Sequence, residues 1–168
     1  TIDFLVNIEK DEHQKDKIYS FSLSSSNDIK LYKRLILHVG YKPVLHDRYN
    51  ACRLVNERPN YSPNYSPIRF LPTDPYVKEA YATFVELNEN NALLCEDGSQ
   101  IQNQSVVECR YDARDDHTKQ KWVPLRTRIS SYPNAFDTAM NVWKSIHQPI
   151  TTLMITTYVT KPLELAVF

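Results

Sequence analysis

Short runs of alternating residues, separated by turn-forming segments, constrain the fold of this chain more than any other feature. In Tyr81–Leu87 the odd-numbered residues share one face of an expected strand, and in Val107–Tyr111 the charged residues Glu108 and Arg110 share one face. The 11 tyrosines outnumber the 2 glycines, and β-branched residues recur in short runs, a bias typical of strands. The sequence therefore predicts a mainly β domain.

The same patterns place the individual elements. We expect strands over residues 2–8, 17–23, 31–39, 81–87, 105–111 and 122–128. From Asn134 onward, apolar residues recur every three or four positions, which predicts a helix with Asn134 as the N-cap, Asp137 in the first turn and Pro149 beyond the end. We assign the apolar stripe of this helix to core packing.

A proline-rich insert interrupts the strand pattern at residues 57–76. It holds five of the ten prolines and a doubled Asn-Tyr-Ser-Pro, at 60–63 and 64–67. Because proline donates no backbone hydrogen bond, we expect an extended strap or loop. A strap that packs on the barrel is favoured over a peptide-like docking site. Residues 96–99 predict a hairpin turn, in which Gly98 would supply the positive φ that such a turn needs.

These elements favour a Greek-key barrel of the OB type, closed or nearly closed, with one C-terminal helix. Its expected extent is 1–151, with residues 152–168 as a linker or tail towards a following domain. OB folds commonly present one face to nucleic acid or nucleotide. The chain lacks an initiator Met and a signal sequence, so we expect it to be part of a longer protein.

Charge, hydropathy and cysteine content exclude several classes of protein, among them membrane-spanning and disulfide-framework proteins. The 20 basic and 20 acidic residues balance, so any nucleic-acid site must be a local patch. No apolar run approaches the roughly 20 residues of a membrane span, so we expect no membrane partner. Cys52, Cys95 and Cys109 lack disulfide-framework or zinc-ligand spacing, which favours a reducing compartment.

Arg126 and Arg128 are the candidate binding residues. They lie two positions apart in an expected strand, so both guanidinium groups project from one face. Two planar, permanently charged groups on one face can grip a polyphosphate. The spacing alone is also typical of surface charge without a function.

A longer stretch around these arginines carries a family resemblance. Trp122 precedes the closely spaced arginines, and Pro133-Asn134 follows at the start of the expected helix. This order resembles the last motif of the mRNA capping guanylyltransferases, and Thr1-Ile2-Asp3-Phe4 is similar to the end of their preceding motif. Segments 107–112 and 143–151 are similar to capping enzymes of large DNA viruses, of the African swine fever virus and mimivirus type. The resemblance spans positions 1–151.

The resemblance implies an OB-fold domain hinged to a nucleotidyltransferase domain of the same polypeptide. A lysine of that other domain attacks GTP, and the GMP passes to the 5′ end of RNA. Arg126 and Arg128 would contact the β,γ-phosphates, with Asp3, Trp122 and Asn134 as supporting residues. Mg²⁺ or Mn²⁺ would be bound mainly through the other domain and GTP. The chain has no K-x-D-G motif, so we expect it to be inactive alone. The implied location is the cytoplasm, in viral factories, and the virion.

One departure from the family pattern concerns the residues after Arg128. The family usually has Asp-Lys there, whereas Ile129-Ser130-Ser131 stands here. We favour a loop omitted from the sequence over a lost phosphate contact.

Other functional assignments are weaker. Asp112, Asp115, Asp116 and His117 lie in a polar run, and we expect a solvated loop rather than a metal site. A single-stranded nucleic-acid-binding module is the main alternative function, since the many tyrosines could stack on bases. The OB domain of a ligase is a third.

Overall fold

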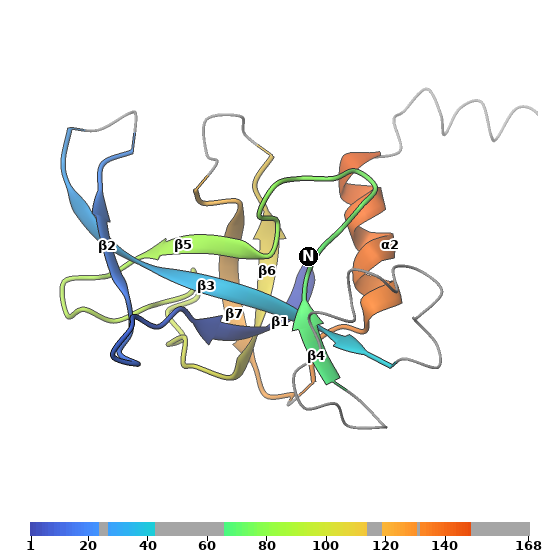
Figure 1. Ribbon diagram of the computed structural model, residues 1–168, viewed down its shortest axis with the longest axis horizontal. Helices are drawn as coiled ribbons and strands as arrows, with labels where there is room; N and C mark the ends of the chain where they lie inside the picture. The colour runs from blue at the N-terminus through green and yellow to red at the C-terminus, as the bar shows by residue number, and fades with distance from the viewer. Residues whose placement is uncertain (24–26, 43–65, 114–118, 131, 149–168) are drawn as a thin grey trace, which may run out of the picture.

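The computed structural model describes residues 1–23, 27–42, 66–113, 119–130 and 132–148, and the strands among them form one antiparallel sheet with a C-terminal helix (Figure 1). The expectation of a mainly β, OB-like fold with a C-terminal helix is confirmed. The elements are β1 (Ile2–Ile8), β2 (Ile18–Phe21), β3 (Lys30–Tyr41), β4 (Ser66–Arg69), β5 (Ala82–Glu86), β6 (Ser105–Tyr111), β7 (Trp122–Arg128) and α2 (Phe136–His147).

Strand β3 organises the sheet because it pairs with four others. β2 and β1 lie along one of its edges, and β5 and β4 along the other, since Leu35 pairs with Ile8 of β1 and with Thr83 of β5. β1 then pairs with β6, and β6 with β7. The path β5-β3-β1-β6-β7 therefore follows the strand neighbours of an OB barrel.

The sheet curves back on itself without closing into a barrel. No ladder joins β5 to β7 in the described part of the chain. Instead, the Phe84 amide donates to the Lys119 carbonyl at 2.9 Å, and the Trp122 amide donates to Thr83 Oγ1 at 3.2 Å. These bonds satisfy edge groups that a closed barrel would pair by a ladder.

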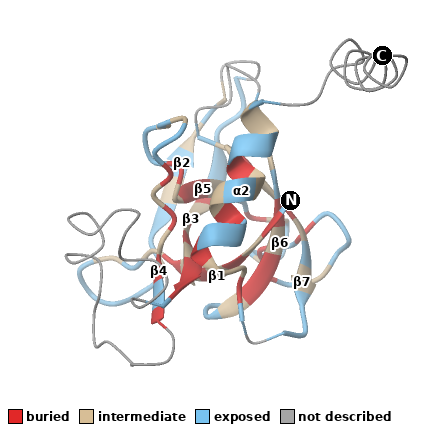
Figure 2. Cartoon of the chain, turned by 90° about the vertical axis from the view of Figure 1, so that its right-hand side faces the viewer, coloured by how far each residue is buried: buried red, intermediate tan, exposed pale blue. Residues whose placement is uncertain are grey.

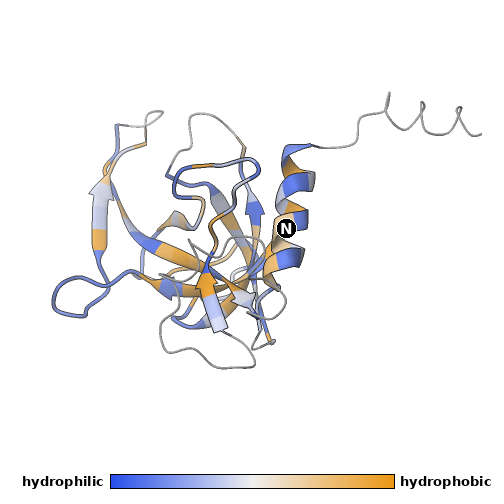
Figure 3. Cartoon of the chain, turned by 45° about the vertical axis from the view of Figure 1, so that its right-hand side comes forward, coloured by the Kyte–Doolittle hydropathy of each residue, from blue (hydrophilic) through white to orange (hydrophobic). Residues whose placement is uncertain are grey.

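The core lies inside this curved sheet and under the helix. Alternate residues of β1 point inward, and Phe4 has its ring 4.9 Å from Trp122 and 5.3 Å from Phe70. Trp143 of α2 packs on Phe70 at 5.6 Å, which joins the helix to the sheet. Figure 2 shows buried parts of the strands at the centre with α2 across them, and Figure 3 shows the apolar residues gathered there, with mostly hydrophilic loops.

The proline-rich insert contains a strand that the sequence did not predict. Strand β4, Ser66–Arg69, pairs antiparallel with the end of β3 although it includes Pro67. A proline is tolerated there because, among the described strands, β4 pairs with β3 alone, so no described neighbour needs a donor from its other edge. The first Asn-Tyr-Ser-Pro lies outside the described residues.

The predicted N-cap of the helix is wrong by one residue. The cap position is held by Ala135, without a side-chain hydrogen bond to the helix. The Asn134 side chain accepts instead from the Asp3 amide, a tertiary partner that replaces the local one. The helix ends at His147, and Pro149 lies outside the described residues. The predicted turn is confirmed, with Gly98 at φ 87° donating to the Cys95 carbonyl at 2.9 Å.

Two further observations concern cysteines and membrane spans. Cys95 and Cys109 are buried free thiols, and burial raises the pKa of both. Cys52 lies outside the described residues.

Among the helical residues that the structure describes, none forms a span long and apolar enough to cross a membrane.

Trp122 allows a test of this core. Its Nε1 donates to the buried Ala80 carbonyl at 2.8 Å. Trp122→Phe keeps an aromatic ring but leaves that carbonyl without its donor, so we expect a loss of about 1–3 kcal/mol of unfolding free energy. Urea unfolding measures it. The control Ile129→Ala, at a fully exposed position, should change stability by less than about 0.5 kcal/mol. Equal stability of Trp122→Phe and wild type would contradict the role of this bond.

Candidate functional site

The two candidate arginines lie on the second half of β7, on one exposed face. Arg126 Nε donates to Glu108 Oε2 of β6 at 2.7 Å, and Arg128 NH1 donates to the same oxygen at 3.3 Å. Their side chains keep 54% and 37% of their surface exposed, whereas that of Glu108 keeps 16%. One carboxylate therefore holds both guanidinium groups side by side while much of each stays open to solvent.

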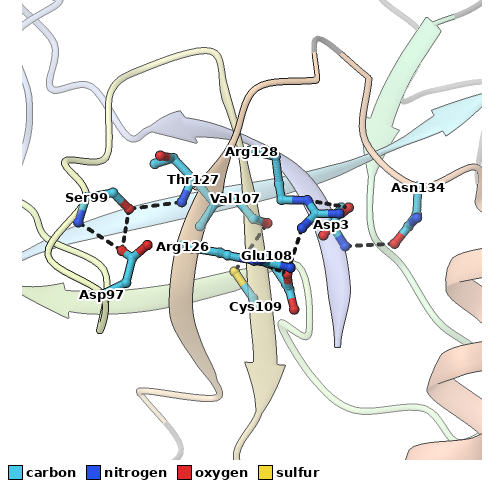
Figure 4. Close-up of polar contacts among 10 residues, drawn as sticks. All are labelled: Asp3, Asp97, Ser99, Val107, Glu108, Cys109, Arg126, Thr127, Arg128 and Asn134. Carbon is cyan, nitrogen blue, oxygen red and sulfur yellow. Dashed lines mark hydrogen bonds and ion pairs between the residues drawn. The ribbon is translucent and has the colours of Figure 1, made fainter.

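Strand β1 extends this group by one more charge (Figure 4). Asp3 pairs with Glu108 in the β1–β6 register, and Glu108 pairs with Arg126 in the β6–β7 register. Arg128 Nε lies 3.4 Å from Asp3 Oδ2. The charged row thus crosses three adjacent strands, and its two carboxylates balance its two guanidinium groups.

Asn134 fixes the position of Asp3 through the backbone. The side-chain oxygen Oδ1 of Asn134 accepts a hydrogen bond from the backbone amide of Asp3 at 2.7 Å. The backbone amide of Asn134 donates to the Asp3 carbonyl at 2.8 Å. The Asn134 carbonyl accepts from the Gly40 amide at 2.9 Å. Asn134 therefore ties the segment before α2 to β1 and β3. Its side-chain oxygen is engaged by this bond rather than aimed at the arginines.

A bulge and a hairpin shape β7 just before the arginines. The β6–β7 register shifts between Glu108 and Cys109, opposite Pro124-Leu125-Arg126. Across the outer edge, the Asp97 amide donates to the Leu125 carbonyl at 3.1 Å, and the Thr127 amide donates to Ser99 Oγ at 3.0 Å. The turn that the sequence predicted thus braces the strand that carries the arginines.

Mutual charge alters the ionisation of the row. The hydrogen bond from Arg126, and then the charges of Arg126 and Arg128, hold the pKa of Glu108 below its ordinary value. The same contact raises the pKa of Arg126. Glu108 is therefore ionised at neutral pH. A phosphate that binds both arginines must compete with this carboxylate.

One predicted supporting residue lies apart from this row, and one residue of the row was not predicted. Trp122 is buried in the core at the opposite end of β7, so its contacts are structural. Glu108 was not predicted as a site residue, because its meeting with the arginines depends on strand register. The only sign of it in the sequence was that Glu108 and Arg110 share the polar face of the expected strand at 105–111.

The part of the chain that the structure describes contains no group of three or more His, Cys, Asp or Glu residues arranged to hold a metal ion. Asp3 and Glu108 contact arginines instead. Asp115, Asp116 and His117 lie outside the described residues, and so does Ser131, on which the continuity of the segment after Arg128 depends.

An OB-like domain with two adjacent, exposed arginines is suited to an anionic ligand. Comparison with protein families gives the particular class. Residues 1–156 match the family described as mRNA capping enzyme, C-terminal domain, and the chain belongs to this family. The resemblance to capping enzymes found in the sequence is thereby confirmed at the level of the family. No curated protein and no solved structure gave a match.

The Glu108 ion pairs predict a pH-dependent contribution to stability. Because the pKa of Glu108 is lowered from 4.5 on folding, its stabilisation is present above that value and is lost as the pH falls below it. Glu108→Gln should therefore lower the thermal unfolding midpoint at about pH 7 and have a much smaller effect at about pH 3. The exposed control Glu89→Gln should show no such difference. A pH-independent effect of Glu108→Gln would contradict this assignment.

Proposed function

We propose that this chain is the OB-fold domain of an mRNA capping guanylyltransferase of the large DNA virus type. The whole enzyme transfers GMP from GTP to the 5′ diphosphate of RNA through a lysyl-GMP intermediate. The lysine lies in a nucleotidyltransferase domain of the same polypeptide. The observation that carries this proposal is the exposed pair Arg126 and Arg128, side by side on β7 of a capping-enzyme domain.

The arginines act on the phosphates of GTP that leave as pyrophosphate. When the OB domain closes over the nucleotide, their guanidinium groups replace Glu108 and Asp3 with β,γ-phosphate oxygens. Phosphate competes well because it is more highly charged and accepts bidentate hydrogen bonds from arginine. Charge that develops on the leaving group strengthens these contacts in the transition state, and closure excludes water.

The remaining chemistry belongs to the other domain. A divalent ion, Mg²⁺ or Mn²⁺, would be held there and by GTP, where it would neutralise phosphate charge. This chain contributes the two arginines, the carboxylates that hold them in place before GTP arrives, and the surface that closes over the nucleotide. Reopening would then admit the RNA end.

The absence of K-x-D-G gives a first test. The isolated chain, incubated with labelled GTP and a divalent metal and then resolved under denaturing conditions, should carry no label. The full-length protein, treated in the same way, should be labelled. A labelled band from the isolated chain would refute the assignment of the nucleophile to another domain.

The arginines give the second test. In the full-length protein, Arg126→Ala and Arg128→Ala should each slow formation of the enzyme–GMP adduct by about 30- to 1,000-fold, the effect of losing a charged contact that strengthens in the transition state. RNA affinity should change much less. Arg110→Ala is a matched control. Arg110 is an exposed arginine of the neighbouring strand β6, and its side chain forms an ion pair with Glu96. Normal adduct formation with weakened RNA binding would overturn this role and favour a nucleic-acid-binding module.

A further inference from the structure

A second surface with binding potential lies on the outer face of β2, β3 and β5. Phe21 stacks on Tyr32 with ring centroids 4.1 Å apart, and Phe84 meets Phe21 edge-on at 5.2 Å. Tyr19 also meets Phe84 edge-on, with ring centroids 4.9 Å apart. These rings face away from the main core, to which β5 contributes Val85. The outer face of the sheet thus carries a cluster of aromatic side chains, and the Lys119 ammonium lies over one of them, Phe21.

A pocket of about 470 Å³ opens beside Phe84. Its apolar part is formed by Val77, Ala82 and Phe84, and charged residues form the rest. These are Arg34, Lys78, Lys119, Lys121 and one acidic residue, Glu79. The Lys119 ammonium also lies 4.0 Å from the centroid of the Phe21 ring. An apolar surface bordered by cations suits a ligand with a flat ring and a phosphate.

The positive charge of this pocket is only partly compensated. Arg34 lies 3.3 Å from Glu9 and 3.6 Å from Glu79. Within the described residues, Lys78, Lys119 and Lys121 form no ion pair. The pocket therefore retains an excess of positive charge, in a chain of zero net charge.

The environment of Lys121 agrees with this excess. Burial, together with the nearby charges of Arg34 and Lys78, lowers the pKa of the Lys121 ammonium against the opposing effect of Glu79. An ammonium group in such a setting gains from a bound anion, which offsets both the burial and the repulsion.

We propose that this pocket binds single-stranded RNA, with a base against Phe84 and the adjoining phosphates on Lys119 and Lys121. That the nucleic acid is RNA rests on the proposed function. In chain order the five strands of the OB path are β1, β3, β5, β6 and β7. The pocket lies on the second and third of them, β3 and β5, and on the connection before the last, which is where OB folds bind oligonucleotides. Charge complementarity and the neighbouring aromatic side chain favour an extended single strand.

The pocket is separate from the arginine row. Lys121 immediately precedes β7, and Arg126 follows five residues later, which corresponds to about 17 Å along a strand. The inner part of an RNA can therefore occupy the pocket without displacing GTP from Arg126 and Arg128.

Fluorescence anisotropy with a short labelled single-stranded RNA tests the proposal on the 168-residue chain. The double variant Lys119→Gln/Lys121→Gln should weaken binding and reduce the slope of log affinity against log salt by about 1.4, because each lost phosphate contact contributes about 0.7. Phe84→Leu, which keeps an apolar side chain, should weaken binding by about 5- to 150-fold through lost stacking. Thermal unfolding of each variant establishes that it is folded.

The control is Lys144→Gln on the exposed side of α2. This variant should retain RNA affinity to within about threefold. Unchanged affinity and salt slope in the double lysine variant would overturn the proposal. Equal, lysine-dependent binding of duplex RNA or of a polyglutamate peptide would also overturn it, by showing a general polyanion surface. Formation of the enzyme–GMP adduct is measured separately, in the full-length protein. Loss of adduct formation would contradict the guanylyltransferase assignment, whereas unchanged RNA binding in the lysine variant would contradict the pocket proposal alone.

Discussion

The packing of Phe4 between Phe70 and Trp122 is the contact on which the fold and the charged row both depend. Side chains of a strand alternate between its faces, so placing Phe4 in the core places Asp3 outside, opposite Glu108. A slip of β1 by one residue would expose Phe4 and move Asp3 into the core. Burial of one aromatic ring therefore also fixes the register that brings a carboxylate to Arg128.

The exposure of the charged row matters for what it can do. A buried, fully desolvated ion pair would hold its arginines firmly, because breaking it would leave an uncompensated charge. Here the guanidinium groups are partly exposed, and exposed ion pairs are weak and screened by salt. Glu108 can therefore orient both arginines and still give way to a ligand of higher charge. Asn134 keeps Asp3 in place during such an exchange, since its bonds are to the Asp3 backbone.

Local patterns in the sequence were sufficient for the strands that supply most of the core. Strands β1, β6 and β7 begin and end where the sequence predicted. In β1 the reason is a strict alternation of buried and less buried residues, which gives it one apolar face. β4 was missed since Pro67 argues against a strand, and only the pairing partners of a strand decide whether its edge tolerates proline. The cap at Asn134 failed for a related reason: a distant amide, from Asp3, occupies its side-chain oxygen.

The same limit applies to the two candidate sites. Arg126 and Arg128 were visible as a pair on one face, but Glu108 joins them only through the β6–β7 register and its bulge. The outer pocket brings together side chains from β3, β5 and the connection before β7, which are remote in sequence. No local pattern predicts such a meeting, because it depends on how the sheet curves back on itself.

Strand β7 connects the two sites mechanically. Its start is fixed to β5 by the Thr83–Trp122 hydrogen bonds, and its second half is braced by the 96–99 turn. A strand held along both edges transmits displacement as a rigid element rather than bending. If the domain closes and opens around GTP, the lysines before β7 and the arginines at its end must move together. An RNA segment bound at the outer pocket would then be carried towards and away from the nucleotide with the same motion that engages and releases the phosphates.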